Sequence, residues 1–172
     1  STASYSFVVY DMVAFRRMND SVKTIEGQPE HWAGYNNGGW VLSDARNWMN
    51  NTLFAALPKE LQTGIKSVEK KCDMGQYYYK EQSQEPVTVS DLIWMPSAEE
   101  LGGTSLSNVV SGQNNPYPLF TTYSSRKKNG GVYYTRSSNM SLMHYFEGVD
   151  SAGNWTTVTG AGGAGMVFGF CL

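Results

Sequence analysis

From residue 131 to the end of the chain, short runs of β-forming residues alternate with turns rich in glycine, serine and asparagine. Each run is long enough for one strand, and the four runs lie at residues 131–136, 142–149, 155–159 and 166–172. Ser-Ala-Gly-Asn at residues 151–154 predicts a hairpin turn between two of them. Because no helical pattern separates these runs, the sequence predicts a meander and favours an α+β fold over a doubly wound α/β fold.

The first half of the chain predicts short helices. Ser43 suits an N-cap, and Ala45 and Trp48 recur at helical spacing after it, so we expect a helix at residues 43–50. Pro58 predicts the first position of a second short helix, because proline lacks only an N–H that would be orphaned there.

Two further strands, a short helix and a long loop are predicted before the meander. Residues 5–10 and 92–95 are rich in β-branched, aromatic or other apolar residues and are expected to be strands. Ser97 and Glu100 have the spacing of a capping box, which predicts a short helix start. Residues 103–123 are rich in Gly, Asn, Ser and Pro and predict a long surface loop.

Length and composition favour one domain. The chain has 172 residues, of which 16% are charged and 18 are glycines, and neither a repeat nor a linker divides it. We therefore expect a single α+β domain at residues 1–172, with two or three short helices packed on a small antiparallel sheet. The chain starts at Ser1 without a Met or a basic segment, so we expect a processed end or the carboxyl-terminal part of a longer chain.

The charge balance argues against nucleic acid as a partner. The chain has 13 Lys and Arg against 15 Asp and Glu, a formal net charge of −2, whereas nucleic-acid binders present a basic surface. The one basic cluster is Arg126-Lys127-Lys128, followed by Asn-Gly-Gly, and it is expected to be a solvated turn. No run approaches the roughly 20 apolar residues of a membrane-spanning helix, so no membrane insertion is expected.

Motifs for metals, cofactors and catalysis are weak. His31, Cys72, His144 and Cys171 lack the close paired spacing of a zinc site, and a disulfide between the two cysteines is left open. Residues 160–165 match G-x-G-x-x-G, but only seven residues follow, too few for the helix that a dinucleotide site requires. We therefore expect no metal, no cofactor and no enzymatic activity.

Aromatic residues have core and contact interpretations. Trp32, Trp40, Trp48 and Trp94 stand among apolar neighbours and are expected in the core, and residues 77–79 predict either an edge strand or an ordered loop. His144, expected on a strand, is interpreted from its neighbours alone as a surface or packing residue. Trp155 opens a strand after a turn, so a core role and an exposed contact role stay equally open.

Several blocks, in order along residues 38–172, resemble those of an uncharacterised family of bacterial and phage domains. The blocks are Gly38-Gly39-Trp40, Leu57-Pro58 to Leu61 with Ile65 to Val68, Ile93 to Ser97 with Glu100, Tyr133 to Ser137, and Phe168 to Leu172. The family looks like a branch of the C-type-lectin-like fold that formylglycine-generating enzymes and retroelement-diversified receptor proteins share. The resemblance implies a small twisted sheet with helices, long loops and chain ends that meet.

The resemblance also implies a function in binding. Such proteins display ligand contacts from their last strands and loops, and Tyr, Trp, Ser and Asn there suit adaptable recognition. It implies a phage tail or bacterial surface protein that binds a host-cell surface protein or other macromolecule, in a region that retroelements diversify in some relatives. The ligand-binding residues expected are Ser138, Asn139, Met140, Leu142, His144, Tyr145, Asn154, Trp155, Thr157 and Thr159.

Two departures and two alternatives accompany this resemblance. The Arg-Pro expected near the end is replaced within residues 166–169, and Tyr134 stands where the family has Trp. A glycan-binding module is the first alternative, although the late loops lack the E-P-N or Q-P-D ligands of calcium-dependent sugar binding. A cysteine-dependent oxidase is the second: residues 169–171 resemble the ending of formylglycine-generating enzymes, but Cys72 matches no such motif.

Overall fold

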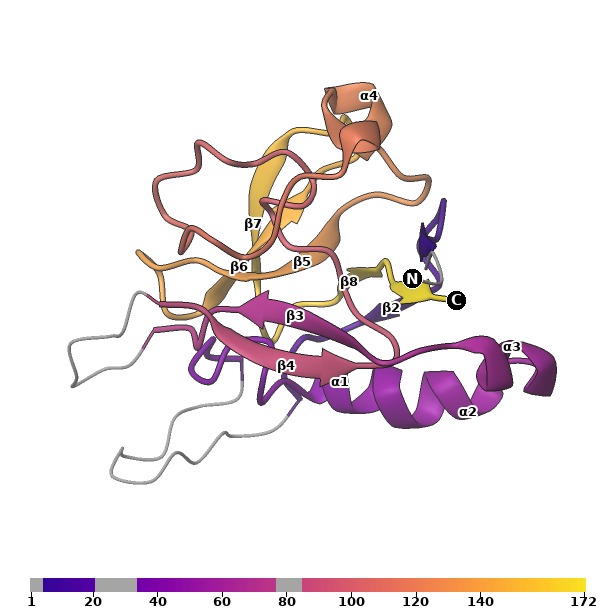
Figure 1. Cartoon of the computed structure of the whole chain (residues 1–172). Coiled ribbons are helices and arrows are strands. Elements are labelled where there is room, and N and C mark those ends of the chain that lie inside the picture. Colours follow the sequence, from indigo (N-terminus) through magenta and orange to yellow (C-terminus); the bar gives the residue numbers. More distant parts are fainter. Residues whose placement is uncertain (1–4, 21–33, 77–84) are drawn as a thin grey trace.

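The structure is a computed structural model that describes residues 5–20, 34–76 and 85–172 (Figure 1). Helices and strands are both present, so the α+β class is confirmed. The strands are β1 (Ser6–Val8), β2 (Ala14–Arg16), β3 (Val68–Cys72), β4 (Val87–Asp91), β5 (Tyr133–Ser138), β6 (Tyr145–Val149), β7 (Trp155–Thr159), β8 (Ala164–Met166) and β9 (Gly169–Cys171). The helices are α1 (Asp44–Trp48), the π-helical η1 (Met49–Leu53), α2 (Phe54–Ala56), α3 (Lys59–Gly64), the 3-10 helix η2 (Pro118–Phe120) and α4 (Tyr123–Arg126).

Elements α1, η1 and α2 follow one another as a single helical stretch. Ser43 is the N-cap, as predicted, and its hydroxyl accepts a hydrogen bond from the Arg46 N–H at 3.0 Å. The stretch continues to Ala56, beyond the predicted end at residue 50, because Leu53 and Phe54 still pack on the core. Pro58 is the N-cap of α3 and lies one residue before the predicted position.

The central sheet has the order β2-β8-β5-β6-β7. The predicted hairpin turn is confirmed between β6 and β7, where the Asp150 carboxylate accepts the N–H groups of Ala152 and Asn154 at 2.8 and 2.9 Å. The pairing of β5 with β8 is parallel, so the sheet is not wholly antiparallel as predicted. The predicted strand at 166–172 divides into β8 and β9, because β9 leaves this sheet to pair with β1.

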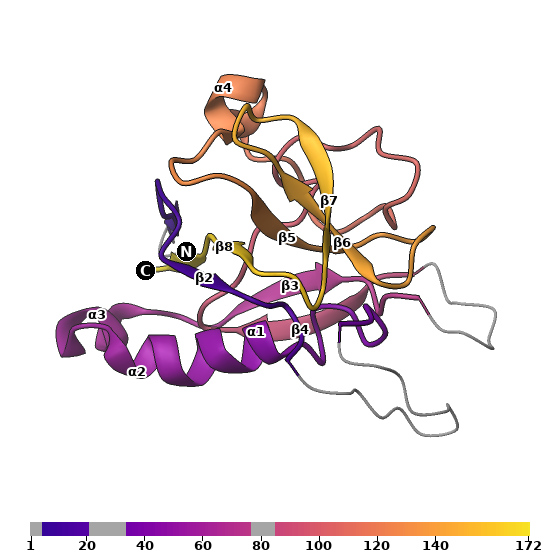
Figure 2. The same cartoon turned by 180° about the vertical axis from the view of Figure 1, so that it is seen from behind.

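The two ends of the described chain lie together. Strands β1 and β9 pair antiparallel, and beyond them the Tyr5 and Leu172 backbones exchange two hydrogen bonds of 3.2 and 3.1 Å. Both views show the indigo start of the described chain near its yellow end (Figures 1 and 2). The helices α1 to α3 run along one side of the molecule next to β3 and β4, whereas β6, β7 and α4 lie at the opposite side.

The predicted strand at residues 92–95 is wrong. The strand is β4, which ends at Asp91, and only Trp94 beyond it forms an isolated bridge with Gly169. The Trp94 N–H donates to the Gly169 carbonyl at 3.0 Å, and the Gly169 N–H donates back at 2.7 Å. A Cβ atom at Gly169 would overlap the indole of Trp94, so these two segments of the chain approach this closely only with glycine at position 169.

The capping box at Ser97 forms, but it closes a turn rather than starting a helix. The Ser97 N–H donates to Glu100 Oε2 and the Glu100 N–H donates to Ser97 Oγ, both at 3.0 Å. The Glu100 carboxylate also pairs with Lys70 Nζ at 2.7 Å and with the guanidinium of Arg136, and all three side chains are buried. This charge cluster holds the turn against β3 and β5.

The basic cluster is not the solvated turn that the sequence predicted. Arg126 and Lys128 are each only 5% exposed, and only Lys127 between them faces solvent. The guanidinium of Arg126 lies 4.9 Å from the ring centre of Trp155, and Lys128 Nζ lies 5.3 Å from that of Phe120. Long cationic side chains lie over aromatic rings in this way, which a charge count does not reveal.

The core prediction for the tryptophans holds where the structure describes them. Trp40 and Trp94 are buried and Trp48 packs half-buried against the larger core cluster, whereas Trp32, His31 and residues 77–79 lie outside the described residues. Cys72 and Cys171 are free thiols. Among the helices of the described residues, none has the length and apolar character to cross a bilayer.

Candidate functional site

The loop at residues 139–144, between β5 and β6, presents several of the predicted contact residues. Leu142 is 48% exposed, His144 is exposed and Tyr145 is half-buried. The imidazole of His144 stacks on the ring of Tyr35, with the ring centres 4.1 Å apart. Together with Gly34, Thr159 and Ala161, the His144 and Tyr145 side chains line a pocket of about 310 Å³, which we call the rim pocket.

Asn36 holds this loop from below. Its amide nitrogen donates to the carbonyl oxygens of Asn139 and Tyr145, each at 2.8 Å, and lies 3.2 Å from that of Leu142. Its N–H donates to the Met143 carbonyl at 2.7 Å. Because the Asn36 side chain is fully buried, these bonds hold the loop in one conformation.

Ser138 and Asn139 are not surface contacts, which corrects the prediction. Both are buried, and the Ser138 N–H donates to Asp73 Oδ2 at 2.9 Å. Asn139 Oδ1 accepts the N–H groups of Ser141 and Leu142 at 2.9 and 2.8 Å, an Asx turn that shapes the loop. Their polar side chains suggested ligand contacts, but the Asn139 side chain bonds to the backbone of its own loop and the Ser138 side chain is covered.

Glu147 completes the support under the loop. Its Oε1 accepts the side-chain amides of Asn139 at 2.8 Å and Asn108 at 2.6 Å. Burial raises the pKa of Glu147, and the two amide bonds act in the opposite direction. Met140, half-buried, joins the same arrangement through its N–H, which donates to the Asn108 carbonyl at 2.8 Å.

The remaining predicted residues lie along the β6–β7 hairpin. Tyr145 pairs with Thr159, whereas Trp155 pairs with Val149 four residues further along, about 13 Å away. Asn154 and Trp155 therefore lie at the far end from the rim pocket, and exposed Thr157 lies between the two ends. The ten predicted residues do not form one surface.

Trp155 has a packing role. It packs partly buried against the smaller core cluster that includes Leu101 and Val149. The guanidinium of Arg126 covers its ring. The structure thus gives Trp155 the core role of the two that the sequence left open.

Sequence reasoning missed Gly34, Tyr35 and Ala161 at the rim pocket. More than a hundred residues separate Tyr35 from His144, so no spacing in the sequence links the two. Gly34 has φ +97 and lies against the backbone of Ala161, which brings the two segments together. No local sequence pattern predicts the contact between Gly34 and Ala161.

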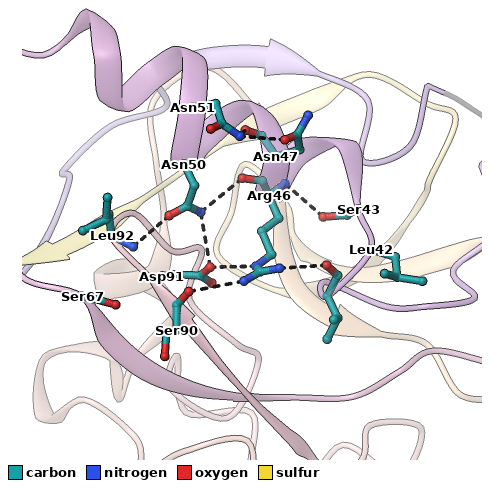
Figure 3. Close-up of a pocket in the computed structure, with 11 residues that line it drawn as sticks. Leu42, Ser43, Arg46, Asn47, Asn50, Asn51, Ser67, Ser90, Asp91 and Leu92 are labelled. Atoms are coloured by element: carbon teal, nitrogen blue, oxygen red, sulfur yellow. Dashed lines mark hydrogen bonds and ion pairs between the residues drawn. The ribbon is translucent and has the colours of Figure 1, made fainter.

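A second, polar pocket of about 420 Å³ lies between the helical stretch and the end of β4 (Figure 3). We call it the asparagine groove, and its lining includes Leu42, Arg46, Asn47, Asn51, Ser67 and Ser90. Asn50 bridges the two walls: its Oδ1 accepts the Leu92 N–H at 2.8 Å and its Nδ2 donates to the Ile93 carbonyl at 2.8 Å. None of these residues was predicted as a contact, because the asparagines fell within a predicted helix or just beyond it.

Groups that suit a metal ion or a reactive thiol are not evident in the described part of the chain. Residues 5–20, 34–76 and 85–172 contain no cluster of three or more His, Cys, Asp or Glu that would hold a metal. Burial raises the pKa of Cys72 to about 12, so its thiol stays protonated at neutral pH.

The comparisons with known proteins give one match. A family model described as a domain of unknown function (DUF6273) matches residues 11–168, which is most of the chain. No curated protein and no solved structure matches.

Proposed function

This chain belongs to the DUF6273 family, and we propose that it is a non-enzymatic binding module that recognises a macromolecular ligand through its rim pocket. The observation that carries the proposal is the stacking of Tyr35 on His144, since His144 lies in the loop at residues 139–144 that Asn36 holds in place. Rigid aromatic surface costs little conformational entropy on binding, so a few such residues supply much of an interface's affinity.

We further propose that the fold is C-type-lectin-like. Three features support this: the paired chain ends, the small central sheet with strands from both halves of the chain, and the helical stretch packed beside it. We propose that the loops that follow β5 and β7 display the receptor contacts and that the helical stretch supports the sheet from one side.

The proposed ligand is a protein on a cell surface, and the proposed location is a phage tail or a bacterial surface. The support is the sequence resemblance together with the apolar, aromatic and hydroxyl-bearing side chains of Leu142, His144, Tyr145 and Thr159. The genes beside this one test the location: tail genes would support a virion, and a reverse transcriptase with an altered copy of the 3′ end would support retroelement diversification.

A cell-binding titration tests the site. Fluorescently labelled chain is titrated onto a panel of bacterial strains, beside a variant that carries His144→Ala and Leu142→Ala. Both side chains are exposed, so we expect cell binding to fall at least about tenfold while the melting temperature changes by no more than about 2 °C.

The control is Lys127→Ala, an exposed residue of the distant α4 region, which should bind as the unmodified chain does. The proposal fails if the unmodified chain binds none of the strains, or if the double variant binds as well as the control.

A further inference from the structure

The asparagine groove combines a compensated charge with unused hydrogen-bonding groups. Arg46 Nε donates to Asp91 Oδ1 at 2.7 Å, and Asp91 Oδ2 accepts the Trp40 indole N–H at 2.8 Å. Asp91 is buried, and its negative charge is neutralised by the ion pair with Arg46. Among the residues that the structure describes, Arg46 and Asp91 are the only charged ones that line the groove, so an ionic ligand gains little net attraction there.

The groove nevertheless offers donors and acceptors to a ligand. Within the described part of the chain, Arg46 donates three of its five N–H groups, to the Asp91 carboxylate and to the carbonyls of Val41 and Ser90, and two N–H groups have no acceptor there. Asn51 donates to Asn47 Oδ1 at 2.7 Å, and within the described residues Asn47 Nδ2 and Asn51 Oδ1 have no partner of their own. An adjacent amide donor and amide acceptor match a pair of neighbouring hydroxyl groups, each of which both donates and accepts.

The groove is also apolar in part and held in shape. Leu42 is 42% exposed on its wall and offers a contact for C–H groups. Asn50 ties the helical stretch to residues 92 and 93, and the π-helical turn η1 carries Asn50 and Asn51 on this side (Figure 3). Such π turns occur often at functional sites.

We propose that the asparagine groove is a binding site for an uncharged saccharide that needs no metal ion. Sugars present vicinal hydroxyls beside an apolar C–H face, and this groove presents amides and hydroxyls beside Leu42 with no net charge. Its volume of about 420 Å³ suits one or two sugar rings. The groove shares no lining residue with the rim pocket, so this site is independent of the proposed receptor contact.

Nuclear magnetic resonance of the ¹⁵N-labelled chain tests the proposal in the presence of EDTA. The probes are maltose, cellobiose, lactose and chitobiose, with glucuronate and phosphate as anionic probes. We expect at least one disaccharide to shift the side-chain amide signals of Asn47 and Asn51, with a Kd on the order of 1 mM.

Variants then assign the site. Asn47→Ala with Asn51→Ala should weaken the disaccharide at least about tenfold, and the fold should survive because the two amides are exposed and bond mainly to each other and to the helix. Thr52→Ala, an exposed neighbour outside the groove, and Tyr145→Ala, at the rim pocket, should both bind as the unmodified chain does.

Four outcomes would overturn the proposal: no disaccharide binds, only the anionic probes bind, the shifts occur at the rim pocket, or the double variant binds as well as Thr52→Ala. The receptor proposal stands or falls separately, on the His144 and Leu142 variant.

Discussion

The carboxylate of Glu100 joins a local turn to two long-range ion pairs. Its bond to the Ser97 N–H follows from a spacing of three residues, which the sequence displays. Lys70 and Arg136 are 30 and 36 residues away from it, and nothing in the local pattern indicates them. A capping box could therefore be predicted here, whereas the buried charge cluster that it serves could not.

Glu100→Gln should destabilise the fold strongly. The variant keeps an oxygen for Ser97 but leaves two buried cations without a counter-charge, so we expect a loss of about 3–5 kcal/mol in the free energy of unfolding at pH 7. Urea denaturation measures it, with Glu60→Gln on the exposed face of α3 as the matched control, expected within about 0.5 kcal/mol.

The same variant tests a pH dependence. Burial alone would raise the pKa of Glu100, but Arg136 and Lys70 outweigh it and hold that pKa below the ordinary value of 4.5. A pKa lowered by folding stabilises the native state above the unfolded-state value, and the stabilisation is lost as the pH falls through the folded-state value. The difference between unmodified and variant chain should thus stay level from pH 7 to about 5 and shrink below that; a difference that grows on acidification would contradict this assignment.

Asn36→Ala should loosen the loop that carries the rim pocket. Removing the amide takes from the Asn139 carbonyl its buried donor and from the Tyr145 carbonyl one of its two donors, and it leaves the Gln76 N–H without its acceptor, so we expect a loss of about 2–3 kcal/mol in unfolding free energy. Faster hydrogen exchange at Ser141 and Leu142 would locate the effect. Asn115→Ala, at an exposed position, is the control, and equal stability of the two variants would show that the Asn36 bonds matter little.

At the scale of elements, turn chemistry was more informative than apolar runs. The residues predicted for the hairpin return, 155–159, coincide with β7, because the turn before them contains the Asp, Gly and Asn that close it. The apolar run at residues 92–95 suggested a strand, but Trp94 is held by one bridge to Gly169. The run is apolar because these residues are buried, and periodicity alone does not distinguish a buried strand from a buried segment of another kind.

Gly169→Ala should disrupt the contact between β9 and Trp94. A methyl group there would overlap the buried indole of Trp94. The backbones of Trp94 and Gly169 are joined by two hydrogen bonds and cannot move apart without breaking them, so we expect at least about 3 kcal/mol of destabilisation or no cooperative unfolding. Gly64→Ala, at the end of α3, adds a methyl group that meets only Leu172 at 3.2 Å and should be neutral or slightly stabilising. Thermal unfolding of the two variants side by side checks this, and similar melting temperatures would contradict the packing argument.

At the scale of the whole molecule, the α+β class and the meander were predictable, and the cross-connections were not. Strands β1 and β2, near the start of the chain, pair with β9 and β8 near its end. The partners are separated by almost the full chain length, so only tertiary packing selects them. The rim pocket has the same origin, because it combines Gly34 with residues 144–161.

A circular permutant tests the adjacency of the ends. Joining residue 172 to residue 5 through a short Gly-Ser linker, with new ends between the exposed residues Thr104 and Ser105, should leave cooperative unfolding intact at a cost of about 1–2 kcal/mol. The matched control opens the chain between Tyr134 and Thr135 in buried β5 and should not fold. Failure of the first permutant, or folding of the second, would contradict the arrangement.

The meeting of the chain ends also determines how this domain responds to mechanical load. Tyr5 and Leu172 lie at the same end of the β1–β9 ladder, so tension applied through the two termini separates the hydrogen bonds one after another, like a zip. A ladder loaded in this direction gives way at lower force than one sheared along its length, where all bonds resist together. In a chain held at both termini, tension would therefore open the β1–β9 pair from its outer end.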